Sequence, residues 1–220
     1  MRESFEENIK ELTEDVVAMS EMVANATSRS VKALGDRDIE EAKRIINDDL
    51  LINKKRWHIE EKCINLIALQ QPVATDLREI IAVLNIITEL ERMGDYAEGI
   101  AKIVIMLGGE PLIRPLIFMP QMAEKANSML RRSMQALVDR DDKTANAICN
   151  EDDEVDKLYD EAYHDLLMRM IKDPSLLSKA TPLIWAAHNL ERIADRVTNI
   201  CERTVYLVTG NIHEVNVSRY

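Results

Sequence analysis

The feature that most constrains the fold of this sequence is an internal repeat. Residues 33–49 match residues 136–152 at nine positions, at a constant offset of 103. Farther along, the stretch 90–95 recurs at 190–195, so the offset falls to 100 and the second copy is three residues shorter. A turn and a motif that recur in the same order indicate a duplicated structural unit.

Each half is expected to form three long helices. Apolar residues recur at three- and four-residue steps, and the chain has only 6 Gly and 6 Pro. These breakers and short polar turns divide the chain into six predicted helices: 3–34, 38–70, 75–107, 116–138, 141–172 and 183–209. Since short turns make consecutive helices antiparallel, we predict an all-α fold of two tandem three-helix bundles, 1–110 and 114–220.

Composition excludes several classes of protein. A net charge of −11 argues against general nucleic-acid binding, and there is no basic cluster to hold phosphate. Cys63, Cys149 and Cys201 are scattered, which is typical of reduced, buried thiols. The charged first ten residues do not resemble a secretory signal, and charges interrupt the most apolar stretch, 80–107. We therefore expect a cytoplasmic protein.

Several acids share a line with apolar residues on their predicted helices. With Leu84 at 0° and 100° per residue, three acids lie within about 40° of it: Glu91, Asp95 and Glu98. The last predicted helix has the same pattern in Glu191, Asp195 and Glu202, in line with Ile184, Ala187 and Val205. The preceding helix of each bundle adds Asp49, and Asp152 with Asp156.

Carboxylates in these positions need compensation. Acids four residues apart repel each other, and burial costs each its hydration. Arg or Lys from a neighbouring helix could compensate them, and so could bound metal; oxygen ligands suit hard cations or iron rather than structural zinc. The alternative is that these acids lie at the edge of the helix contact and are solvated.

Several short motifs in this sequence resemble those of the PhoU family, and the resemblance covers essentially the whole chain. The family's E/D-x-x-x-D motif matches Glu91 to Asp95 and Glu191 to Asp195. Two further strings resemble family patterns, QPVATDLR at 71–78 and TNICERTVYLVTG at 198–210.

The resemblance implies a function. PhoU-like proteins have two three-helix bundles, and some carry multinuclear metal clusters at the acidic motifs. They restrain high-affinity phosphate uptake and phosphate-starvation signalling, acting with the phosphate ABC transporter, at its cytoplasmic ATPase side, and a membrane sensor histidine kinase. They are not known to catalyse a reaction. For this chain the resemblance implies a non-enzymatic homodimer with metal ions (iron, zinc, magnesium or manganese) at Glu91, Asp95, Glu191 and Asp195. Asp49, Asp152 and Asp156 would support them.

The two copies differ at these positions. Asn53 stands where the second copy has Asp156, and Glu98 stands where it has Thr198. Ala101 and Lys102 stand where it has Cys201 and Glu202. We therefore expect two unequal sites.

Two alternatives remain open. A ferritin-like di-metal enzyme needs two E-x-x-H motifs, and this chain has one, Glu161 to His164, on the side of its helix away from the acids. A metal-free helical adaptor would have the same partners without metal. His188 is interpreted as a residue at the edge of the core. Trp57 and Trp185 could anchor an interface, but such residues are more often part of the core, which is the interpretation adopted for both.

Overall fold

The computed structural model describes residues 2–109, 113 and 116–211, and every regular element in that part of the chain is helical. The helices are α1 (Arg2–Asp36), α2 (Ile39–Gln70), α3 (Thr75–Leu107), α4 (Phe118–Asp139), α5 (Asp142–Cys149), α6 (Asp152–Lys172) and α7 (Leu177–Thr209), with a 3-10 turn, η1 (Pro174–Leu176). The all-α prediction is confirmed, and the first three predicted helices agree with α1–α3 within two residues.

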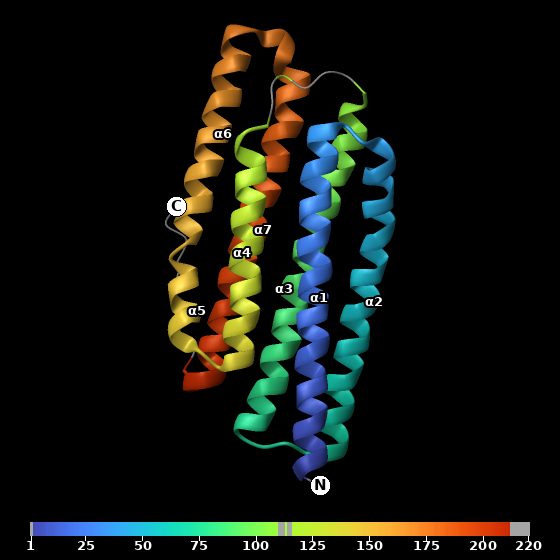
Figure 1. Cartoon of the computed structure of the whole chain (residues 1–220), viewed down its shortest axis with the longest axis vertical. Helices are drawn as coiled ribbons and strands as arrows, with labels where there is room; N and C mark the ends of the chain where they lie inside the picture. The colour runs from blue at the N-terminus through green and yellow to red at the C-terminus, as the bar shows by residue number, and fades with distance from the viewer. Residues whose placement is uncertain (1, 110–112, 114–115, 212–220) are drawn as a thin grey trace.

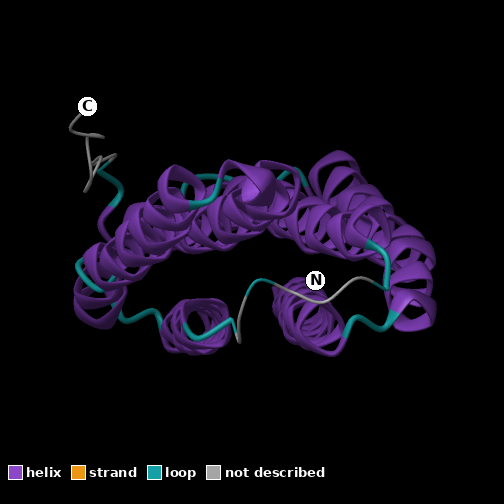
Figure 2. Ribbon diagram, turned by 90° about the horizontal axis from the view of Figure 1, so that it is seen from above, coloured by secondary structure: helices purple, strands orange, loops and turns teal. Residues whose placement is uncertain are grey.

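The helices form two layers. The broad layer contains α2, α3, α7 and the α5–α6 pair, in that order, while α1 and α4 pack together on one side of it (Figures 1 and 2). In the broad layer α3 and α7 are the central, antiparallel pair, and they join the two halves of the chain (Figure 1). The core draws on α1–α7, and Cys63, Cys149 and Cys201 are all buried in it.

The first turn of each repeat has the same geometry in both halves. Arg37 and Arg140 are left-handed, with φ of 58° and 54°. The amides of Asp38 and Asp141 each donate 2.9 Å hydrogen bonds to the carbonyls of residues 33 and 136. Both aspartates then cap the next helix with their side chains, as expected for short acids at an N-cap. The repeat read from the sequence is therefore a repeat of structure.

Three helix boundaries differ from the prediction. The predicted helix 141–172 is broken at Asn150 and Glu151 into α5 and α6. The last helix begins at Leu177 rather than 183, and Pro182 lies inside it, in its second turn. The fourth helix begins at Phe118 rather than 116, with Pro120 in its first turn, where a missing N–H costs little. The predicted linker positions 110–112, 114 and 115 lie outside the described residues.

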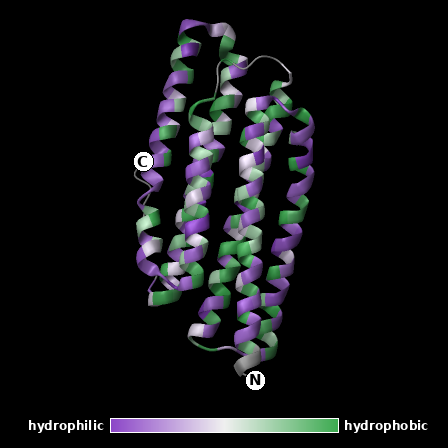
Figure 3. Ribbon diagram, in the orientation of Figure 1, coloured by the Kyte–Doolittle hydropathy of each residue, from purple (hydrophilic) through white to green (hydrophobic). Residues whose placement is uncertain are grey.

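The two tryptophans are exposed, so the prediction that they belong to the core is wrong. Trp57 is 59% and Trp185 51% exposed. Apolar and polar residues are interspersed along the helices (Figure 3), and among the described residues no helix combines the length and apolarity needed to cross a bilayer.

Candidate metal centres

The two acidic motifs lie beside each other on the central helix pair. Glu89 of α3 accepts hydrogen bonds from Asn199 (3.2 Å) and Arg196 (3.3 Å) of α7. Because α3 and α7 are antiparallel, this contact sets the 91–95 and 191–195 stretches at a similar height in the layer. On α3, Met93 and Ile100 lie about 160–180° from the acid line and are fully buried, so the acids point away from the core.

Four acids of α2 and α3 form the first carboxylate cluster: Asp49, Glu91, Asp95 and Glu98. Burial, followed by the charges of the other three acids, raises the pKa of Asp49 to about 6. Asn53 donates a 2.8 Å hydrogen bond to Asp49 Oδ2, while Asp49 Oδ1 is buried without a partner. The pKa of the half-buried Glu91 is also raised, mainly by burial. Asp95 is exposed, and partial loss of solvent together with the charge of Glu98 raises its pKa.

The first cluster has cations close by. The charges of Arg56 and Arg92 act on Glu91 and oppose the rise in its pKa. Lys102 donates a 2.5 Å hydrogen bond to Glu98. This cluster is therefore partly neutralised by the protein itself.

A glycine in the motif brings α2 and α3 together at this cluster. A Cβ at Gly94 would lie 3.2 Å from Asp49 Oδ1 and from a methyl group of Ile52. A cleft of about 400 Å³ between α1 and α2 also reaches Asp49, Gly94 and Glu98. Arg29 lines this cleft.

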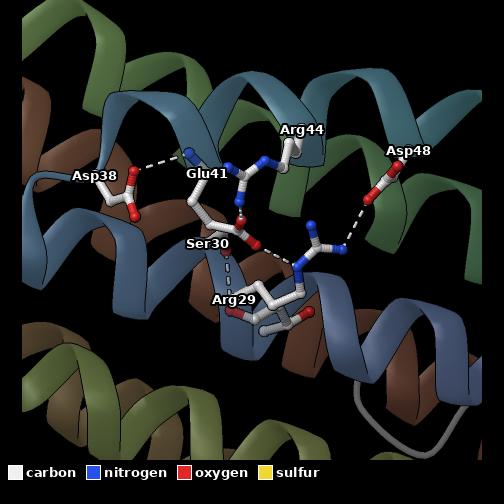
Figure 4. A network of polar contacts seen from close by, with 7 residues as sticks. Arg29, Ser30, Asp38, Glu41, Arg44 and Asp48 are labelled. Atoms are coloured by element: carbon white, nitrogen blue, oxygen red, sulfur yellow. Dashed lines mark hydrogen bonds and ion pairs between the residues drawn. The ribbon is translucent and has the colours of Figure 1, made fainter.

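A polar network holds the α1–α2 wall of the cleft in place (Figure 4). Arg29 donates to Glu41 at 2.6 Å and to Asp48 at 2.8 Å. Arg44 also donates to Glu41, at 2.8 Å, and Asp38 caps α2 at the backbone N–H of Glu41. The network fixes α2 against α1 at the level of Asp49.

The second carboxylate cluster comes from α6 and α7: Asp152, Asp156, Glu191 and Asp195. Asp152 is only 7% exposed, and its Oδ1 has no hydrogen-bond partner. Burial, followed by the neighbouring carboxylates, raises the pKa values of Asp152 and Glu191 to about 7 each. The pKa of the half-buried Asp195 is raised as well, mainly by burial. Asp156 is exposed on α6, and partial loss of solvent together with the charges of neighbouring aspartates raises its pKa.

The surroundings of the second cluster differ from those of the first. Arg192 donates a 2.6 Å hydrogen bond to Asp195, and the charges of Arg192 and Arg196 oppose the rise in the pKa of Glu191. His188 Nδ1 lies 3.1 Å from Glu191 Oε2, but that oxygen accepts no hydrogen bond. The surroundings of the two carboxylate clusters therefore differ in their cationic neighbours.

The clusters are not ready-made metal cages. Across the residues that the structure describes, no three His, Cys, Asp or Glu side chains are gathered in a metal-binding group. The donor chemistry nevertheless fits a hard cation, because three buried carboxylate oxygens have no hydrogen-bond partner: Asp49 Oδ1, Asp152 Oδ1 and Glu191 Oε2. Glu202, also a predicted ligand, lies near Cys149 on α5.

Comparison with known proteins identifies related sequences and structures. The PhoU domain model matches residues 16–104 and residues 119–204. The chain belongs to the PhoU family. A Clostridium acetobutylicum relative, described as a phosphate-specific transport system accessory protein PhoU homolog, is 38% identical over 98% of this chain and 99% of its own length. A Rhizobium meliloti protein of the same description is 36% identical over 94% of this chain and 88% of its own length.

Solved structures of PhoU proteins have the same fold. The phosphate transport system regulatory protein PhoU from Streptococcus pneumoniae superposes with a TM-score of 0.88 at 33% identity, covering 96% of this chain and 99% of its own. PhoU from Pseudomonas aeruginosa superposes with a TM-score of 0.88 at 31% identity, covering 94% of this chain and 100% of its own.

The sequence allows Arg or Lys from a neighbouring helix to compensate the acids, but it does not identify which arginines contact the motif residues. The spacing of Arg192 and Asp195 (i, i+3) is the signal that could have found one pair. The contact of Arg196 with Glu89 joins residues 107 apart in sequence and leaves no local signal. Glu161, the acid of the single E-x-x-H motif, is exposed on α6.

Proposed function

We propose that this protein is an accessory regulator of phosphate transport. The observation that carries the proposal is similarity over nearly the full chain to proteins described as phosphate-specific transport system accessory proteins. In this proposal the protein lies in the cytoplasm, catalyses no reaction and docks on the phosphate ABC transporter and a sensor histidine kinase. When phosphate is plentiful, it stabilises the signalling-off state of the kinase and restrains uptake by the transporter. It would do so by shifting the conformational equilibrium of these partners rather than by catalysis.

We also propose that the two carboxylate clusters bind metal ions. Asp49, Glu91, Asp95 and Glu98 would hold one site, and Asp152, Asp156, Glu191 and Asp195 the other. Magnesium, manganese and iron match all-oxygen ligands, and His188 beside Glu191 would also suit zinc at the second site. A bound cation would supply the positive charge that the unpartnered oxygens lack, and so order the face that carries both motifs.

The second cluster should bind metal more tightly. It has two unpartnered buried oxygens, on Asp152 and Glu191, whereas the first has one. Cationic side chains act on both clusters and do not distinguish them. We expect calorimetric titration with Mn²⁺ at about pH 7.5, above the raised pKa values, to resolve two classes of site. D152N/E191Q should abolish the tighter class, while D49N should weaken only the other.

The matched control for this titration is E161Q, an exposed amide substitution on the same helix as Asp152. It should leave both sites unchanged. Wild-type protein that binds no Mn²⁺, Fe²⁺, Zn²⁺ or Mg²⁺ would favour the metal-free adaptor. Oxidase activity lost in E161Q would instead favour the ferritin-like alternative.

The regulatory role is tested by deleting the gene in its own host and measuring phosphate uptake and starvation-gene output in phosphate-rich medium. We expect both to rise, and wild-type protein supplied in trans to restore them. D152N/E191Q, at equal abundance, should restore them less well if metal serves regulation. Unchanged uptake and output after deletion would contradict the regulatory proposal without bearing on metal binding.

A further inference from the structure

Two cysteines that are far apart in the sequence meet in the core of the second half. Cys149 is the last residue of α5 and Cys201 lies within α7, and both thiols are fully buried. The thiol of Cys201 donates a hydrogen bond to the sulfur of Cys149. Cys149 Sγ in turn donates to the carbonyl oxygen of Thr198, one turn before Cys201 on α7, at 3.8 Å. These two contacts hold the sulfur atoms side by side.

The thiol pair is a property of the second repeat. The matching positions of the first half hold Ile46 and Ala101. Ala101 is fully buried and Ile46 packs partly buried against the core, so apolar side chains fill the same place there. The fold therefore does not need sulfur at this place, and packing alone does not explain why two thiols meet.

An ion pair lies between the thiols and the solvent. Arg132 of α4 donates a 2.7 Å hydrogen bond to Glu151, which stands in the break between α5 and α6. The charges of both residues act on Cys201, and their side chains are 46% and 29% exposed. Because helix ends open more readily than helix interiors, opening of this break would give a small solute access to the thiols.

The geometry of the pair suits a covalent link. Hydrogen-bonded sulfur atoms must approach each other by roughly 1.5 Å to reach the bond length of a disulfide, about 2.05 Å. The helix that carries Cys149 has eight residues and ends there, so a small shift of one helix end brings the atoms together. In a reducing compartment such a pair is kept as thiols, and its disulfide forms transiently, as in redox sensors.

We propose that Cys149 and Cys201 are a redox modification site, which hydroperoxides convert reversibly into a disulfide between α5 and α7. One thiol attacks the peroxide, whose O–O bond breaks, and gives a sulfenic acid and water. The other thiol then attacks that sulfur, so that the S–S bond forms, the S–O bond breaks and a second water leaves. The two thiols thereby lose two electrons and two protons, which the peroxide takes up.

The disulfide would tie the start of α6 to α7. Asp152 is the first residue of α6, three residues after Cys149, whereas Glu191 and Asp195 lie on α7. Oxidation would therefore restrain the junction at which the two helices of the second carboxylate cluster meet. The thiol pair itself does not depend on the function or the metal binding proposed above.

The first test treats the full-length, metal-free protein with excess hydrogen peroxide, blocks the remaining thiols and maps the peptides by mass spectrometry. Wild type should lose two hydrogen atoms, give a Cys149–Cys201 disulfide that dithiothreitol reverses, and gain roughly 5 °C in Tm. C63S, which removes the third thiol, should behave in the same way. C201A and C149I, which take the residues of the first repeat, should form no disulfide and gain no Tm, with helicity by circular dichroism as in wild type.

The proposal would be overturned by wild-type protein in which both thiols survive the peroxide unchanged, or in which they become sulfinic or sulfonic acids without a disulfide. A disulfide that pairs Cys63 as often as it pairs Cys149 with Cys201 would also overturn it, because it would come from unfolded chains.

The second test addresses the route of access. Arg132→Ala removes the ion pair at the break and should speed disulfide formation by about threefold, the factor expected for a partly exposed pair. Arg131→Ala is the matched control, because Arg131 precedes it on α4 and pairs instead with Glu21 of α1. It should oxidise at the wild-type rate. Equal rates in both variants would overturn access through the break.

Discussion

Metal-free protein is expected to lose about 3 kcal/mol of unfolding free energy between roughly pH 5 and pH 8. The ordinary pKa values of Asp152 and Glu191 are 3.8 and 4.5, and in the fold both are raised to about 7. Between those values the folded state binds more protons than the unfolded state, so stability falls as pH rises. A tenfold change in proton affinity between the two states corresponds to about 1.4 kcal/mol, and mutual coupling makes the total smaller than the sum over residues.

The measurement is guanidinium unfolding in EDTA at about pH 5, 6.5 and 8. D152N should be more stable than wild type at the highest pH, similar at the lowest, and should show a shallower slope, because it removes one buried charge. E161Q, an exposed change on α6, should follow wild type. The lowered pKa of His188 acts in the opposite direction, but its side chain is 53% exposed and its effect is small. Stability that is flat or rises towards alkaline pH would contradict the prediction.

A divalent cation should reverse this loss. Metal binds the ionised carboxylates of the folded state, so its contribution grows as pH rises and protons leave. Stability at about pH 8 with Mn²⁺ should then approach or exceed that at about pH 5 without it. Metal binding at the unpartnered carboxylate oxygens would thus be measurable as a gain in unfolding free energy at alkaline pH.

The positions of the clustered acids could be predicted because helix periodicity alone places side chains on a face. The helix faces that carry Asp49, and Glu91 with Asp95, follow from a rotation of 100° per residue. Short turns then bring the neighbouring helices together. The break between α5 and α6 could not be predicted in this way. Asn150 has an identical counterpart in Asn47, where α2 continues without interruption. The shared Asn therefore does not by itself decide where the helix breaks.

The arginine contacts show the same limit. Arg92 and Arg192 occupy matching positions, yet Arg92 lies 3.2 Å from Glu89 and Arg192 lies 2.6 Å from Asp195. The difference follows from the neighbouring residues, because Glu89 has Asn189 as its counterpart and Arg196 has Tyr96. Which acid each arginine contacts therefore cannot be predicted from the sequence motif of a single helix.

Substitution of Arg196 is expected to be the most damaging single change at the α3–α7 contact. Its side chain is 14% exposed and lies 3.3 Å from Glu89, which is 15% exposed. Arg196→Ala leaves the mostly buried Glu89 without its charged partner from α7 and also removes a charge that opposes the rise in the pKa values of Glu191 and Asp195. We expect a loss of about 3 kcal/mol in unfolding free energy at roughly pH 8.

Arg92→Ala is the matched control, because Arg92 also contacts Glu89 but is 50% exposed. It should cost less than about 1 kcal/mol. Changing both partners to neutral residues of similar size, E89Q/R196M, should recover much of the loss, since no buried charge is then left unpaired. If Arg196→Ala costs no more than Arg92→Ala, the contact between the halves depends on apolar packing of α3 against α7, and the buried pair serves orientation alone.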